Sequence, residues 1–307
     1  MQVMLISGLT SFVVTTMGFL LSLWIFPRLH LLDFPARYGL ERKRLPYPTG
    51  VIAILVVLGL LVAREDQSII NTPLLSAIVL LGAISFIDDR WRVSPWIRII
   101  IQGIVALIVF IGGARIYTIT HPFGGFIKLD AWVIATPLGS LPVLSGIFTI
   151  GWLMFTMNAM NWTDGIRGQT SIIATAGFVL LGLLAHLRTQ QPEIAVVAWV
   201  LAGASGAGIF FEFPPGKMLI GDTGSMFYGL MLGLLGIMSG GKVATVFLAL
   251  GIPLFDAVFV TIERMTNGRS PLQGGRDHLH HLLLDRRWSE RRIILIIGLI
   301  EIGRAHV

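Results

Sequence analysis

Apolar residues form long runs that follow one another along almost the whole chain, and polar residues gather in short segments between them. A run of about 20 apolar residues can cross the roughly 30 Å hydrocarbon layer of a membrane as an α-helix. Prolines, glycines and charged residues divide the runs into separate helices. The pattern predicts ten spans, near 2–27, 49–63, 72–87, 96–113, 141–160, 169–187, 194–211, 218–239, 243–261 and 292 onward.

Two segments depart from this pattern. Residues 114–130 are polar and rich in glycine and threonine, which is typical of a short hairpin between spans. The last apolar run is too short to cross a membrane before it reaches residues 301–307. Because this heptapeptide resembles a translated sequencing-adapter read-through, we interpret 301–307 as an artefactual tail. The expected fold is an all-α polytopic membrane protein, with one transmembrane domain over 1–307, a truncated last helix and an extracytoplasmic hairpin.

Basic residues assign a side of the membrane to each loop. Loops 28–48, 88–98, 158–168, 212–217 and 262–292 hold 5, 3, 1, 1 and 7 Lys and Arg residues, which is 17 of the 23 in the chain. Cytoplasmic loops of membrane proteins carry such an excess. These five loops are therefore predicted to face the cytoplasm, and the N-terminus the outside.

Composition excludes several classes of protein. The chain is 54% hydrophobic and 13% charged, whereas an ordinary globular domain is about 25% charged. A soluble domain is therefore excluded. The topogenic loops account for the net charge of +6, so no nucleic acid is expected as a partner. The chain has no cysteine, so a metal must have oxygen or imidazole ligands.

The polar motifs all fall on the predicted cytoplasmic side. Asp88 and Asp89 end the third span, and adjacent carboxylates repel each other unless a cation or a raised pKa relieves them. One could bind a metal while the other accepts a proton. For a single aspartate, ordinary solvation at a helix end is an equally open alternative.

A second motif ends the fifth span. Asn158, Asn161 and Asp164 are spaced by three residues and share one broad helical face. Amide and carboxylate oxygens suit a hard cation such as Mg²⁺, which often bridges phosphates. Hydrogen bonding between helices is the alternative interpretation.

The eighth span begins with Gly221-Asp222-Thr223-Gly224-Ser225, just after Lys217. The free N–H groups of a helix N-terminus can receive a phosphate, although such residues are also ordinary helix caps. Asp222 adds a carboxylate for a metal. The segment could therefore bind an anion through its N–H groups and a cation through Asp222.

The last basic loop contains His278, His280 and His281, three of the seven histidines in the chain. Such clusters often bind zinc, usually together with a cysteine or carboxylate at a defined spacing. Nearby arginines favour contacts with a diphosphate or a sugar instead: Arg264, Arg269 and Arg276. Together with the basic first loop, the motifs offer metal ligands and a cationic rim, which suits phosphoryl transfer between a nucleotide and a lipid phosphate.

The motifs, taken in order, resemble those of a known family. They are Asp33-Phe-Pro35 with Arg42-Lys43 and Pro48, Phe86-Ile-Asp88-Asp89, Asn158-Ala-Met-Asn161-Trp-Thr-Asp164-Gly165, Pro215-Gly-Lys217 through Gly221-Asp222-Thr223-Gly224-Ser225, Pro253-Leu-Phe-Asp256 and His278-Leu-His280-His281. This set resembles the polyprenyl-phosphate N-acetylhexosamine-1-phosphate transferases of glycosyltransferase family 4. It spans nearly the whole chain.

The resemblance implies transfer of a sugar-1-phosphate from a UDP-N-acetylhexosamine to undecaprenyl phosphate, with release of UMP. It implies Mg²⁺, or Mn²⁺ in its place, and the bacterial cytoplasmic membrane with its lipids. Such a reaction starts the synthesis of an envelope glycan such as lipopolysaccharide or teichoic acid. It also leaves a homodimer open.

The resemblance also implies roles for residues. Asp222 would be the leading metal ligand and Asp88 a base or a phosphate-orienting group, with Asp89 as its electrostatic partner. The implied metal ligands are Asp222, Asp89, Asn161 and Asp164. The implied substrate contacts are Lys43, Asn158, Asn161, Asp164, Lys217, Asp256, Arg276, His278, His280 and His281.

Three features bear on the substrate. His-Leu-His-His after Arg269-Ser-Pro resembles the branch that uses UDP-GlcNAc more than the branch that uses a muramyl-pentapeptide donor. Arg167 stands where the family has a second acid near the nucleotide, and Glu212 stands where it has an asparagine. Phospho-muramyl-pentapeptide transfer remains the alternative activity, and an ion or solute transporter is the alternative from another class. Against a transporter, the acids cluster at one face and the chain has no internal repeat.

Overall fold

Helices occupy every predicted span that the structure describes. The computed structural model describes residues 1–38, 41–64, 71–91, 93–121, 123–137, 139–239, 250–270, 275 and 277–304. Its elements are α1 (Gln2–Arg28), a 3-10 helix (Pro35–Tyr38), α2 (Gly50–Val62), α3 (Thr72–Trp91), α4 (Pro95–Ile111), β1 (Thr118–Thr120), β2 (Phe126–Lys128), β3 (Val133–Thr136), β4 (Gly139–Pro142), α5 (Val143–Trp162), α6 (Gln169–Leu187), α7 (Pro192–Glu212), α8 (Gly221–Met238), α10 (Gly251–Thr266), α11 (Leu279–Asp285) and α12 (Glu290–Arg304).

Five of the described helices are long and apolar enough to cross a membrane: α1, α3, α5, α6 and α7. Helices α2 and α4 are apolar but shorter. A multi-pass membrane protein is therefore confirmed in outline. The count of ten spans and the outward N-terminus stay predictions.

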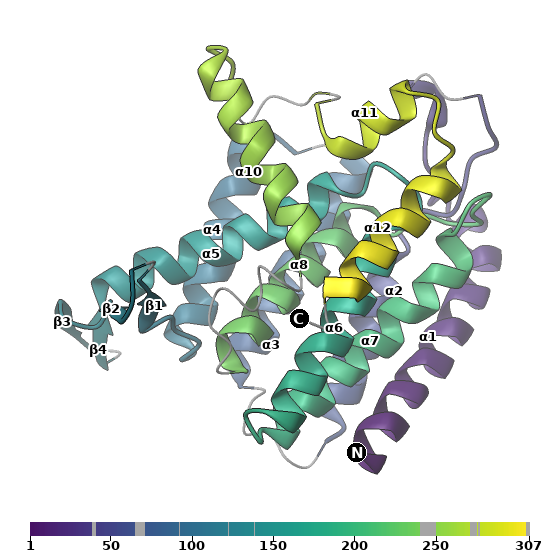
Figure 1. Cartoon of the computed structure of the whole chain (residues 1–307). Coiled ribbons are helices and arrows are strands. Elements are labelled where there is room, and N and C mark those ends of the chain that lie inside the picture. Colours follow the sequence, from purple (N-terminus) through teal and green to yellow (C-terminus); the bar gives the residue numbers. More distant parts are fainter. Residues whose placement is uncertain are drawn as a thin grey trace.

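Helix α8 forms the centre of the helical assembly (Figure 1). It contacts α2, α3, α5, α6 and α7, and nearly all of its side chains are buried. Small residues permit this close packing, since they let helix backbones approach one another. A Cβ added at Gly229 would lie 2.5 Å from the Thr156 carbonyl oxygen of α5, and one at Gly50 would lie 2.3 Å from the Gly224 nitrogen. The N-terminus of α8 is thereby held against α2, and its middle against α5.

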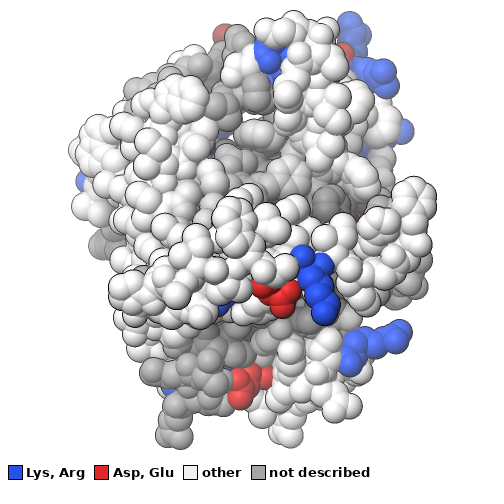
Figure 2. All heavy atoms as spheres, turned by 90° about the vertical axis from the view of Figure 1, so that its left-hand side faces the viewer, with Lys and Arg blue, Asp and Glu red and all other residues white. Residues whose placement is uncertain are grey.

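Helix α1 lies at the edge, packed along α7 (Figure 1). Gly203 and Gly8 meet there, and the Ser11 hydroxyl donates to the Val200 carbonyl at 2.6 Å. The opposite face of α1 exposes large apolar side chains, including Leu9 and Trp24. Among the described residues on one side of the molecule, Figure 2 shows mostly uncharged surface with charges in a few small groups. A surface of this kind fits contact with lipid chains.

The expected all-α fold is wrong in one region. The predicted hairpin at 114–130 contains the antiparallel strands β1 and β2, and a second hairpin, β3 and β4, follows it. Gly124 and Gly139 have φ of +103° and +105°, which suits glycine at the turns. The β-branched residues Val133 and Ile134 favour the extended backbone over a helix. Helix α5 therefore begins at Val143 rather than at the predicted residue 141.

Substitution of Gly229 tests the close approach of α8 to α5. We expect Gly229→Ala to lower the thermal unfolding temperature of the purified protein, because the new methyl group meets the α5 backbone and overpacking costs about 1–3 kcal/mol. Gly151→Ala, in α5, is the matched control, since a Cβ there meets no atom within 4 Å. Equal unfolding temperatures for the two variants would contradict this packing.

Candidate active site

The turn between α3 and α4 brings an acid and an arginine together. Asp88, in the last turn of α3, accepts a hydrogen bond from the Val93 N–H at 2.6 Å. Ser94 and Pro95 then start α4, and proline suits the first position of a helix because its missing N–H is not needed there. Arg98 therefore lies in the first turn of α4, beside the end of α3. Its Nε lies 3.1 Å from Asp88 Oδ2.

Asp89 caps the buried N-terminus of α8. Its Oδ1 accepts hydrogen bonds from the Tyr47 hydroxyl and from the Asp222 N–H at 3.0 Å. Its Oδ2 accepts from the Thr223 N–H at 2.9 Å and from the Thr223 hydroxyl at 2.6 Å. A carboxylate at this position satisfies N–H groups that have no partner within the helix and complements the helix dipole. Both oxygens of Asp89 thus hold the start of α8 in place.

The first loop is joined to the segment before α8, which places Tyr47. The Leu219 N–H donates to the Pro46 carbonyl at 3.1 Å, and the Thr49 N–H donates to the Leu219 carbonyl at 2.9 Å. At the other end of the loop, Asp33 forms an ion pair with Arg42 at 2.6 Å. The family motif around Asp33 therefore stabilises the loop.

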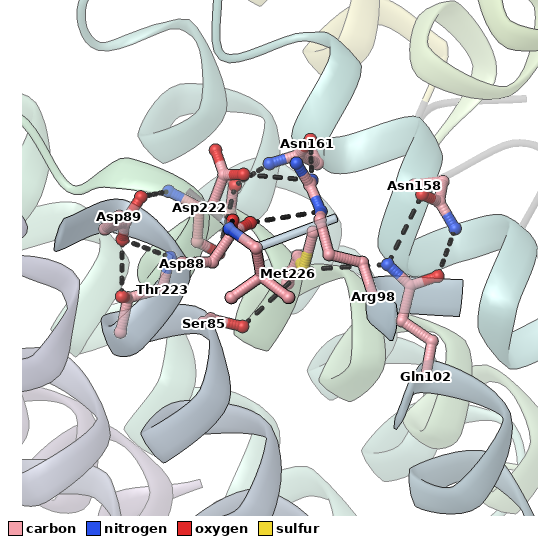
Figure 3. Close-up of polar contacts among 12 residues, drawn as sticks. Ser85, Asp88, Asp89, Arg98, Gln102, Asn158, Asn161, Asp222, Thr223 and Met226 are labelled. Atoms are coloured by element: carbon pink, nitrogen blue, oxygen red, sulfur yellow. Dashed lines mark hydrogen bonds and ion pairs between the residues drawn. The ribbon is translucent and has the colours of Figure 1, made fainter. Parts of the chain in front are cut away.

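Arg98 brings two of the predicted metal ligands, Asp222 and Asn161, into one cluster with Asp88 (Figure 3). Its Nη2 lies 2.9 Å from Asp222 Oδ2 and 3.3 Å from Asn161 Oδ1. The other end of the Asn161 amide donates to the Ser225 hydroxyl at 3.1 Å. Four helix termini, the ends of α3 and α5 and the starts of α4 and α8, thus meet around one guanidinium group.

This cluster fits a hard divalent cation. A single cationic nitrogen lies between a carboxylate oxygen of Asp222 and an amide oxygen of Asn161. Among the described residues, no three His, Cys, Asp or Glu side chains lie together as a metal site. Mg²⁺ does not require such a set, because it commonly binds one or two carboxylates and completes its shell with water and phosphate oxygens.

Asn158 is engaged in the contact between helices α5 and α4. Its Nδ2 donates to the Gln102 Oε1 at 2.6 Å and to the Met154 carbonyl at 2.7 Å. The Gln102 amide returns a longer hydrogen bond of 3.4 Å. The structure therefore places Asn158 in interhelical hydrogen bonding, and its contact with substrate stays a prediction.

Asp164 lies in the loop after α5, beside a second buried acid. Its Oδ1 accepts from the Thr170 hydroxyl at 2.9 Å. Glu212, at the end of α7, accepts from the Ser171 hydroxyl and from the Ile220 N–H. Burial, together with the Glu212 carboxylate, raises the pKa of Asp164 well above the usual range for an aspartate. A nearby cation would relieve this unfavourable charge.

The histidine loop closes over the end of α5. Asp256 of α10 lies 2.8 Å from His278 Nδ1 and also accepts from the Leu279 N–H at 2.8 Å, so it holds the start of α11. The ring of His280 stacks on His278 and presses against Gly165, where an added Cβ would lie 2.0 Å from Nε2. The family motifs at Asp164-Gly165, Asp256 and His278 are thus adjacent in space.

The remaining predicted residues that the structure describes lie outside the Arg98 cluster. Lys43 and Lys217 are exposed on their loops, and the His281 ring lies 4.2 Å from that of His280. Arg276 lies outside the described residues. Arg167, the departure from the family pattern, forms an ion pair with Glu290 of α12 at 2.8 Å and donates to the Pro215 carbonyl at 2.7 Å.

Sequence reasoning missed Arg98, Tyr47 and Gln102. Arg98 was counted only among the topogenic arginines of a cytoplasmic loop. The Ser-Pro helix start three residues before it could have placed it in a first helical turn beside Asp88. Tyr47 had no local signal, because its partner lies 42 residues away in the sequence.

Comparison with known proteins identifies a family that matches more than half of the chain. A family model described as glycosyl transferase family 4 matches residues 71–240. The chain is 26% identical to the probable undecaprenyl-phosphate N-acetylglucosaminyl 1-phosphate transferase of Bacillus subtilis, over 87% of this chain and 74% of that protein. It is 29% identical to the decaprenyl-phosphate N-acetylglucosaminephosphotransferase of Mycolicibacterium smegmatis, over 83% and 68% of the two chains. It is also 29% identical to the phospho-N-acetylmuramoyl-pentapeptide-transferase of Enterococcus hirae, over 80% and 77%.

The two acidic positions at α8 should differ in their effect on stability. We expect Asp89→Ala to lower the thermal unfolding temperature of the purified protein, since each buried donor left without an acceptor costs about 1–3 kcal/mol. Asp222→Ala should cost less, because its side chain is 28% exposed. If Asp222→Ala unfolds at the lower temperature of the two, Asp89 does not have the capping role described.

Proposed function

This chain belongs to glycosyl transferase family 4, and from that premise we propose that it transfers N-acetylglucosamine-1-phosphate from UDP-N-acetylglucosamine to undecaprenyl phosphate. UMP is the second product, and the reaction takes place at the cytoplasmic face of the bacterial inner membrane. The observation that supports this most directly is the convergence of Asp88, Asp222 and Asn161 on one cationic centre.

The reaction brings two phosphate groups of like charge together. An oxygen of the lipid phosphate attacks the sugar-bearing phosphorus of the donor. The bond from that phosphorus to the bridging oxygen breaks, and UMP leaves with the electron pair. Neutralising charge and holding the groups in line are the main catalytic tasks in such a transfer.

The residues of the cluster divide these tasks. Asp222 and Asn161 would hold Mg²⁺, with Mn²⁺ as a substitute, and the cation would supply charge neutralisation at the diphosphate. Asp89 fixes the α8 N-terminus, so that Asp222 is presented in a constant position. Asp88 orients the Arg98 guanidinium, whose positive charge would also attract substrate phosphates.

The histidine loop supports a role in donor binding. His278 is oriented by Asp256, and His280 rests on Gly165, next to Asp164. Imidazole N–H groups can donate to sugar hydroxyls or phosphate oxygens. Arg167 and its partner Glu290 would then take part in recognition of the nucleotide end.

The nature of the sugar separates the two candidate activities. The names of the relatives from Bacillus subtilis and Mycolicibacterium smegmatis favour N-acetylglucosamine, as does the His-Leu-His-His pattern. The relative from Enterococcus hirae carries the muramyl-pentapeptide activity. An assay of the purified protein with UDP-N-acetylglucosamine and, separately, with the UDP-muramyl-pentapeptide donor decides between these activities. We expect lipid-linked product from UDP-N-acetylglucosamine alone.

Loss of Asp222 tests the proposed site. We expect Asp222→Asn to reduce formation of lipid-linked sugar by about a hundredfold or more, because a key source of charge stabilisation at the phosphates is lost. The measurement is UMP release and lipid product with purified protein, undecaprenyl phosphate, UDP-N-acetylglucosamine and Mg²⁺. Excess EDTA should abolish the activity of the unsubstituted protein.

The matched control is Asp130→Asn, an exposed aspartate between β2 and β3, which should retain full activity. Retention of activity by Asp222→Asn, with the protein still inserted in membranes, would refute the site assignment.

A further inference from the structure

The guanidinium of Arg98 uses its nitrogens for different partners. Nε contacts Asp88 at 3.1 Å, whereas Nη2 alone contacts both Asp222 at 2.9 Å and Asn161 at 3.3 Å. Oxygens of Asp222 and Asn161 also suit a hard cation. A cation bound to them would lie close to the guanidinium, and the two positive groups would repel each other.

The surroundings decide which partner can move. Asp88 is 7% exposed and receives a backbone hydrogen bond from Val93, so it is fixed. Asn161 is held by Ser225, which is fully buried. The Arg98 and Asp222 side chains are both 28% exposed, but the arginine is longer and has more rotatable bonds. The Nη2 end of Arg98 is therefore the part of the cluster that can move furthest while Asp88 holds Nε.

Charge counting favours an exchange over a permanent ion pair. Asp88 and Asp222 both contact the Arg98 guanidinium, and their two formal negative charges against its one positive charge leave −1. A divalent cation held by Asp222 and Asn161 would neutralise this remainder and supply further positive charge for a phosphate. Once displaced, Nη2 still belongs to a guanidinium that Asp88 retains through Nε.

We propose that Arg98 Nη2 and the divalent cation are alternative occupants of the position between Asp222 and Asn161, and that Asp88 keeps the displaced guanidinium beside the site for a substrate phosphate. This rests on the proposed function for the identity of the metal-dependent reaction. It makes Arg98 a competitor for metal and a positioning group for phosphate, and it makes Asp88 the anchor of that arginine.

Metal affinity without substrate provides the test. Free Mn²⁺ would be titrated into the purified full chain and followed by its electron paramagnetic resonance signal, for the unsubstituted protein, Arg98→Gln and Arg115→Gln. We expect Arg98→Gln to bind Mn²⁺ about tenfold more tightly, a typical coupling between competing ligands. Arg115, which donates to the Phe110 and Ser140 carbonyls on another part of α4 and β4, is the matched control and should leave affinity unchanged.

Turnover should change in the opposite direction. Arg98→Gln should transfer sugar-phosphate more slowly at saturating metal, because the phosphate loses its guanidinium. Unchanged or weaker Mn²⁺ binding by Arg98→Gln would overturn the exchange. If that variant does not fold, Arg98→Lys serves instead, since one ammonium cannot hold Asp88 and Asp222 together, and it should bind Mn²⁺ more tightly than the unsubstituted protein. If Arg98→Gln binds Mn²⁺ more tightly but the unsubstituted protein transfers no sugar-phosphate, the proposed function is refuted while the exchange of Arg98 and the cation stands.

Discussion

The buried N-terminus of α8 is the constraint on which the rest of the site depends. The helix lies at the centre of the bundle, where its first N–H groups cannot be left without acceptors. Asp89 supplies both of its oxygens to the backbone and side chain of that first turn, and Tyr47 from the first loop completes the contact. Because α8 begins at this cap, Asp222 in its first turn lies next to the ends of both α3 and α5.

Two adjacent aspartates are compatible because they face different partners. Asp89 accepts neutral donors at the start of α8, whereas Asp88 accepts the Val93 N–H and the Arg98 guanidinium. Each carboxylate has its own set of donors, and these hydrogen bonds act against the repulsion between the two charges. The pair thereby combines a structural cap with an electrostatic anchor, one residue apart.

Much of the fold follows from hydropathy, because every apolar run of sufficient length became a helix where it is described. The hairpin β3 and β4 could not be predicted, since two strands of four residues carry too little periodicity. The motif residues Asp88, Asn161 and Asp222 were found because polar groups at one membrane face are unusual. Their common partner Arg98 was not, because an arginine in a cytoplasmic loop has a sufficient topogenic explanation. Asn158 shows the opposite case, where spacing alone cannot separate a ligand from an interhelical hydrogen bond.

The most direct test of the account follows the two phosphates of the donor separately. Purified protein would be given undecaprenyl phosphate, Mg²⁺ and UDP-N-acetylglucosamine labelled with radioactive phosphorus at either the phosphate next to uridine or the phosphate next to the sugar. Transfer of sugar-1-phosphate predicts that the sugar-side label enters the lipid fraction while the uridine-side label appears in UMP, in equal amounts. Recovery of the sugar-side label in UDP, or its absence from the lipid fraction, would contradict the proposed reaction.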